Sequence, residues 1–112
     1  MVTDPQQPDD DEPAATDPPA VRLTVFVRGQ VQGVGFRWWV RARALELGLT
    51  GVAANLADGR VQVLAEGERS RCERLLALLG EQPSSTGRPG GVTGLSEQWL
   101  PARGVHQGFV ER

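Results

Sequence analysis

The chain has 112 residues, a length that suits one domain and is too short for two ordinary ones. It has one cysteine, Cys72, and one histidine, His106, which excludes an internal disulfide and a four-ligand Cys/His metal site. The net charge is −2, but residues 21–112 hold twelve arginines against eight acids, a net charge of +4; because these arginines are scattered, a small anionic ligand fits better than nucleic acid.

Residues 1–20 form a predicted disordered tail. They contain six acids, five prolines and no basic residue, and they offer few apolar side chains to bury. The segment has neither the basic start nor the apolar run of a secretory signal, and no stretch of about 20 apolar residues follows that would span a membrane. We therefore expect a cytoplasmic protein with a folded domain over residues 21–112 and no membrane or nucleic-acid partner.

The folded part opens with a predicted strand and a predicted helix. Residues 21–28 alternate between apolar and polar side chains, which is typical of a strand with one buried face. Beyond a glycine-rich loop, apolar residues recur at three- and four-residue spacing until Gly48, which is placed as a C-terminal cap. The apolar stripe of this helix consists of Phe36, Val40, Ala44 and Leu47.

Residues 50–67 are predicted to form a hairpin around Asp58-Gly59, a dipeptide typical of two-residue turns. Such a turn pairs Ala57 with Arg60 and, further along the strands, Asn55 with Gln62. The same register gives six apolar residues a common face and leaves Asn55 on the other face. The six are Val52, Ala54, Leu56, Val61, Val63 and Ala65.

A second helix and further strand segments complete the chain. Ser70 followed by Glu73 is a capping-box pattern, and the helix that it opens ends at Gly80. After a loop over residues 81–91, residues 91–100 are a predicted strand, and the terminal GFVER is either an edge strand or a final turn. The apolar stripe of the second helix consists of Cys72, Leu75, Leu76 and Leu79.

The order strand, helix, strand, strand, helix, strand predicts an α+β, ferredoxin-like (βαββαβ) fold. In this fold an antiparallel sheet carries two helices on one face. Enzymes, RNA-binding modules and regulators all use it, so the function has to be inferred from a site.

The segment GQVQGVGFRWW, residues 29–39, places Gly33 and Gly35 directly before the first helix. Glycines there permit positive φ angles, and the free N–H groups of a helix start attract anions. Arg37 lies in the first turn, where a cation is disfavoured unless a bound anion compensates it, and its guanidinium matches two phosphate oxygens. A phosphate-binding loop is one interpretation; a flexible connection followed by a solvated arginine is the other.

Two segments carry a resemblance to a known family. VRGQVQGVGFR, residues 27–37, resembles the phosphate-loop signature of the acylphosphatase family, and residues 51–67 resemble its second signature, N-x-x-x-G-x-V with a closing glycine. The resemblance covers residues 21–112 and includes GFVER as the closing strand. It implies a small ferredoxin-like enzyme that hydrolyses the carboxyl–phosphate bond of acyl phosphates without a metal or cofactor, and we expect it to act as a monomer.

The resemblance also implies roles for individual residues. Arg37 would hold the phosphate and Asn55 would orient the attacking water. Residues 29–48 contain no Ser, Thr, Cys or His, which agrees with direct attack by water and no covalent nucleophile. The backbone that forms the phosphate cradle would come from Gln32, Gly33, Val34, Gly35 and Phe36.

Rival interpretations remain at this point. Val52-Ala53-Ala54 replaces bulkier residues usual in the family, so a non-catalytic module that binds phosphate or acyl phosphate as a regulatory signal is the alternative function. RNA binding on the open sheet face would need exposed aromatic residues, and only Phe26 is a candidate. Of Trp38 and Trp39, we expect one in the core and the other as a partly exposed cover, with contact to an aromatic acyl group as the alternative.

Overall fold

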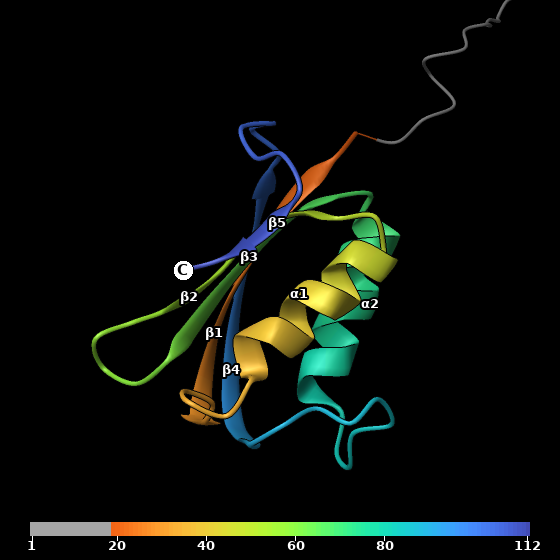
Figure 1. Cartoon of the computed structure of the whole chain (residues 1–112). Coiled ribbons are helices and arrows are strands. Elements are labelled where there is room, and N and C mark those ends of the chain that lie inside the picture. The colour runs from red at the N-terminus through yellow and green to blue at the C-terminus, as the bar shows by residue number, and fades with distance from the viewer. Residues whose placement is uncertain (1–18) are drawn as a thin grey trace, which may run out of the picture.

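The computed structural model describes residues 19–112 as a five-stranded sheet with two helices on one face (Figure 1). The tail predicted over residues 1–20 lies, up to residue 18, outside the described residues. No helix in the described range is long and apolar enough to cross a membrane. In chain order the elements are β1 (Val21–Gln30), α1 (Phe36–Glu46), β2 (Thr50–Asn55), β3 (Val61–Gly67), α2 (Arg69–Gly80), β4 (Gly91–Pro101) and β5 (Phe109–Glu111).

The strand order is β4-β1-β3-β2-β5, so the predicted ferredoxin-like arrangement is confirmed, but the sheet is mixed and not wholly antiparallel. The terminal segment forms an edge strand that pairs with β2 in parallel. This direction follows from the connection over residues 102–108, because β4 ends at the end of the sheet where β2 begins. The chain crosses over at that end of the sheet, so β5 begins beside the start of β2 and runs parallel to it.

A buried carboxylate fixes this crossing to the sheet. Glu66 accepts hydrogen bonds from the N–H groups of Arg103 and Gly104, at 2.8 and 2.9 Å, and from Nε of Arg22 at 2.6 Å. Burial tends to raise the pKa of Glu66, but the hydrogen bonds from Arg103, Arg22 and Gly104 outweigh it, and the pKa is lowered. Glu66 therefore stabilises the path to β5 in its charged form.

The register of the β2–β3 hairpin differs from the prediction by one residue. Asn55 pairs with Val61 and Ala53 with Val63, because the N–H of Leu56 donates to the carbonyl of Arg60 and leaves a three-residue loop. Gly59 takes the left-handed position in this loop, with φ +93°, as three-residue hairpin loops require. A shift of one residue turns β2 over, so Asn55 lies on the helix-facing side and not, as predicted, on the opposite face.

The core lies between the sheet and the helices. Val25, Val27 and Val63 are fully buried, and Trp39 is buried while Trp38 is exposed, which confirms the prediction of one core and one covering tryptophan. The predicted helix stripes are largely confirmed, although Leu47 and Leu76 are only partly buried. The buried residues of the helices are Phe36, Trp39, Val40 and Ala44 in α1, and Cys72, Leu75, Leu78 and Leu79 in α2.

The predicted cap of α2 is wrong. The helix begins at Arg69, and the N-cap is Glu68, whose carbonyl accepts from the N–H groups of Arg71 and Cys72. Ser70 therefore lies inside the first turn, where its hydroxyl donates to the Glu68 carboxylate at 2.9 Å. In the described part of the chain, no side-chain hydrogen bond caps this helix.

Candidate active site

The connection from β1 to α1 has the backbone shape of an anion-binding loop. Gly33 and Gly35 have φ angles of +74° and +88°, and Gly35 is the N-cap of α1. The first helical hydrogen bond runs from the N–H of Trp39 to the carbonyl of Gly35, so the three preceding N–H groups have no helical acceptor. The first turn contains no acidic residue and no side-chain cap, which leaves these donors available to a ligand.

A hollow of about 60 Å³ lies at this helix start. A Cβ atom added at Gly33 or Gly35 would meet nothing within 4 Å, so the space in front of the loop is open. Arg37 is the cationic side chain of the hollow. The lining residues are Val31, Gly33, Gly35, Phe36, Arg37, Trp38 and Glu111.

Two of the predicted cradle residues do not line the hollow. The side-chain amide of Gln32 donates to the carbonyls of Leu56 and Arg60, at 2.8 and 2.9 Å. These bonds tie the loop to the β2–β3 hairpin, so Gln32 holds the cradle in place by its side chain. Val34 is 43% exposed and does not line the hollow.

Arg37 and Asn55 meet at one oxygen atom. Nη1 of Arg37 donates to the main-chain oxygen of Arg112 at 2.6 Å, and the N–H of Asn55 donates to the same oxygen at 3.1 Å. Among the described residues, nothing hydrogen-bonds the side chain of Asn55, which is exposed and free to bind water. Residues from α1 and from the end of β2 therefore share one small region of the sheet edge.

The helix that carries Arg37 is fixed to β5 one turn further on. Nε of Arg41 donates to the carbonyl of Phe109 at 2.9 Å, while Phe109 itself is buried beneath α1. Two arginines four residues apart thus bind backbone oxygens in β5 and directly after it. The family resemblance supplied the closing strand, but no spacing signal indicates that Glu111 lines the hollow or that Arg112 binds Arg37.

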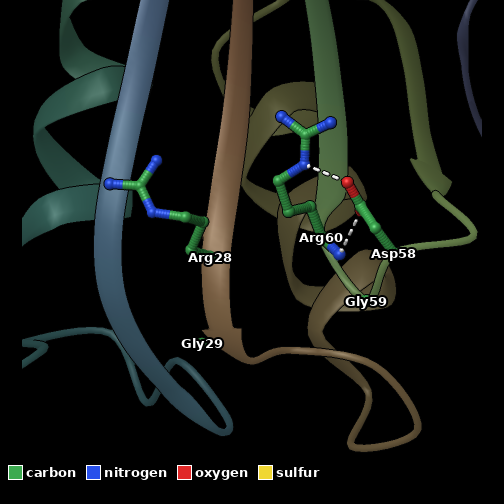
Figure 2. A pocket seen from close by; sticks show the side chains of 5 residues that line it. All are labelled: Arg28, Gly29, Asp58, Gly59 and Arg60. Atoms are coloured by element: carbon green, nitrogen blue, oxygen red, sulfur yellow. Dashed lines mark hydrogen bonds and ion pairs between the residues drawn. The ribbon is translucent and has the colours of Figure 1, made fainter.

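A second and larger hollow, of about 380 Å³, lies on the opposite face of the sheet (Figure 2). Figure 2 shows its two arginines pointing apart, with Arg28 towards β4 and Arg60 back along β3. Nε of Arg60 is paired with Asp58 at 2.8 Å, and its guanidinium stacks over Phe26 at 4.9 Å. The N–H of Arg60 donates to Asp58 and lowers the pKa of that carboxyl. This hollow lacks the converging donors of the first one.

Cys72, the one cysteine of the sequence, is not a reactive nucleophile. Cys72 is fully buried under β3, where burial raises the pKa of its thiol to about 11. A thiol with that pKa is almost wholly protonated at neutral pH, and the thiolate is the reactive form. The prediction of a core thiol is confirmed. Among residues 19–112, no three His, Cys, Asp or Glu side chains gather as a metal site would require.

Comparison with known proteins agrees with the geometry. The sequence model of the acylphosphatase family matches residues 23–110. An acylphosphatase of Acidothermus cellulolyticus is 65% identical over 91 residues, which cover 81% of this chain and 86% of the relative, and one of Corynebacterium efficiens is 62% identical over 92 residues, covering 82% and 92%.

Solved structures of acylphosphatases are also similar to this chain. The crystal structure of acylphosphatase from Bacillus subtilis has a TM-score of 0.72 and 30% identity, covering 82% of this chain and 98% of that one. An acylphosphatase from Coxiella burnetii has a TM-score of 0.72 and 33% identity, covering 84% and 94%. With the glycine loop and Arg37 at the helix start, and a family match that spans both signatures, the chain belongs to the acylphosphatase family.

Proposed function

We propose that the hollow at the start of α1 binds the phosphate of an acyl phosphate while water attacks the phosphorus atom. As a member of its family the protein hydrolyses acyl phosphates to a carboxylate and inorganic phosphate. The observation that carries the assignment of the site is the convergence of open helix-start N–H groups and the Arg37 guanidinium on one hollow. No observation favours the alternative of a non-catalytic regulatory module.

In this proposal the loop and Arg37 share the charge of the phosphate. The main-chain donors from residues 32–36 approach the oxygens at the positive end of the helix dipole. Arg37 has five N–H donors, and within residues 19–112 its hydrogen bond to Arg112 uses only Nη1, so the others remain for phosphate oxygens. These donors stabilise the charge that develops on the transferring phosphoryl group.

Asn55 positions the attacking water. Its side-chain carbonyl accepts a hydrogen from water and its amide donates to an oxygen, but it does not act as a base at neutral pH. The oxygen of water forms a bond to phosphorus as the bond from phosphorus to the acyl oxygen breaks. The electron pair leaves with the carboxylate, which is a weak base and needs no proton, and the proton of the water passes to a phosphate oxygen.

The proposal requires no metal, because Arg37 and the main-chain N–H groups supply the positive charge. We also propose that the protein acts as a monomer in the cytoplasm. One chain supplies all the donors of the proposed site, which lie between Gln32 and Arg37. Size-exclusion chromatography with light scattering tests the oligomeric state, and a dimer at working concentration would contradict this part.

Hydrolysis of benzoyl phosphate by the purified protein tests the assignment. Wild type is expected to turn over the substrate in EDTA, with inorganic phosphate as a competitive inhibitor. Arg37→Ala and Asn55→Ala are each expected to lose about 10²- to 10³-fold in rate, the usual loss for one transition-state donor. Arg74→Ala, which removes an exposed arginine on α2 away from the hollow, is the control and should stay within about twofold.

A further inference from the structure

Two adjacent tryptophans in α1 have different surroundings. Trp39 is 3% exposed, stacks on Phe36 with ring centroids 5.9 Å apart, and donates its indole N–H to the carbonyl of Thr86. Trp38 is 63% exposed and has no hydrogen-bond partner among the described residues, yet it lines the hollow that contains Arg37. Packing therefore explains Trp39 but leaves the side chain of Trp38 available to a ligand.

The size of the hollow decides where an acyl group would lie. At about 60 Å³ the hollow is several times smaller than the roughly 300–1,000 Å³ of usual small-molecule pockets, so an acyl chain on a phosphate held there extends out over the lining residues. The acyl group must therefore extend out of the hollow across its rim, the part of the lining that Trp38 and Glu111 form. Trp38 lines the hollow together with Gly33 and Gly35, as expected for a helix side chain that leans towards the N-terminus of its helix.

Glu111 forms another part of the same rim. It pairs with Ala53 in the β2–β5 register and lies on the helix-facing side of the sheet, like the buried Phe109 two residues before it. Its carboxylate forms no ion pair among the described residues, since Arg37 binds the main-chain oxygen of Arg112 instead. The rim thus combines a flat apolar ring with a carboxylate that has no ion-pair partner among the described residues.

We propose that Trp38 and Glu111 select the acyl group of the substrate. A flat, uncharged acyl group gains by stacking on the indole of Trp38, whereas an acyl group with a second carboxylate is repelled by Glu111. The enzyme is thereby tuned to acyl phosphates whose acyl part is planar and neutral. This inference rests on the proposed phosphate site, because only a phosphate held by Arg37 brings the acyl group to this rim.

Three substrates test it: benzoyl phosphate, 4-carboxybenzoyl phosphate and acetyl phosphate, compared by kcat/KM. Trp38→Ala is expected to lower the ratio of benzoyl to acetyl phosphate about threefold to tenfold, and Trp38→Phe to restore most of it. Glu111→Gln is expected to raise the ratio of 4-carboxybenzoyl to benzoyl phosphate about fivefold at low salt, and less at 0.5 M salt. Leu45→Ala and Glu73→Gln, exposed residues elsewhere on the helices, are controls that should move neither ratio.

The outcomes separate this inference from the proposed function. If wild type hydrolyses all three substrates and the Trp38 and Glu111 variants leave both ratios unchanged, the selection by the rim is wrong and the phosphate site stands. If wild type hydrolyses none of them, the proposed function itself is wrong. A ratio that moves equally in the control variants would also overturn the assignment to Trp38 and Glu111.

Discussion

Gly35→Ala is the most specific test of the glycine loop before α1. Gly35 gives the loop its left-handed backbone and also leaves open space in front of it. The first contribution predicts an effect on stability and the second an effect on activity. The φ of Gly35, +88°, is in the left-handed region, and a Cβ there would meet nothing within 4 Å. Gly35→Ala therefore introduces no collision in the ligand-free protein. The cost is the backbone conformation alone, about 1–2 kcal/mol for a residue with a Cβ in that region.

Gly87 is a matched control for this substitution. It has φ +70°, its added Cβ also meets nothing within 4 Å, and it lies in the loop between α2 and β4, outside the candidate site. Gly35→Ala and Gly87→Ala should each lower Tm by about 5–15 °C, since a domain of this size loses about 4–8 °C per kcal/mol. Thermal unfolding followed by circular dichroism measures both changes.

The two variants should differ in activity. At Gly35 the new methyl group occupies the space in front of the loop, and any relief of the strained φ angle moves the N–H groups of the helix start. Displacement of binding groups by about 1 Å costs about 10²-fold in rate, so Gly35→Ala should lose about that factor in kcat/KM for benzoyl phosphate at 25 °C. Gly87→Ala should keep wild-type activity. Equal activities in the two variants would refute the role of the loop as a phosphate cradle.

The other predictions concern stability and reactivity. Because the pKa of Glu66 is lowered in the folded state, its contribution is present above its ordinary value of 4.5 and is lost as the pH falls through the lower, folded value. Glu66→Gln should therefore unfold in urea with about 2 kcal/mol less stability at pH 7, a difference that shrinks below pH 4.5; a constant difference would contradict the hydrogen-bonded carboxylate. Cys72, with its thiol pKa of about 11, should not react with a thiol reagent at pH 8 until the protein is unfolded, and rapid labelling of the native protein would show that the thiol is accessible.

Local sequence patterns predicted the features of the fold that depend on a single helix or strand. The alternation in β1 and the apolar stripes of α1 and α2 follow from burial of one face, and the glycine loop before Arg37 could be recognised because its chemistry is contiguous in sequence. The resemblance to a family supplied Asn55, which spacing alone did not single out.

Features that depend on pairs of distant segments were not predictable in this way. The hairpin register depends on whether Asp58-Gly59 makes a two-residue or a three-residue loop, and one residue of difference turns Asn55 to the other face. The position of β5 depends on a crossing held by Glu66, and the contact between Arg37 and Arg112 joins residues 75 positions apart. No local propensity distinguishes these alternatives, because tertiary contacts decide them.

A crystal structure of the protein with inorganic phosphate tests the central claim most directly. We predict a phosphate in the hollow at the start of α1, with oxygens within hydrogen-bond distance of N–H groups of residues 32–36 and of the Arg37 guanidinium. An empty hollow at phosphate concentrations that inhibit turnover, with Arg37 bound only to the main-chain oxygen of Arg112, would contradict the account.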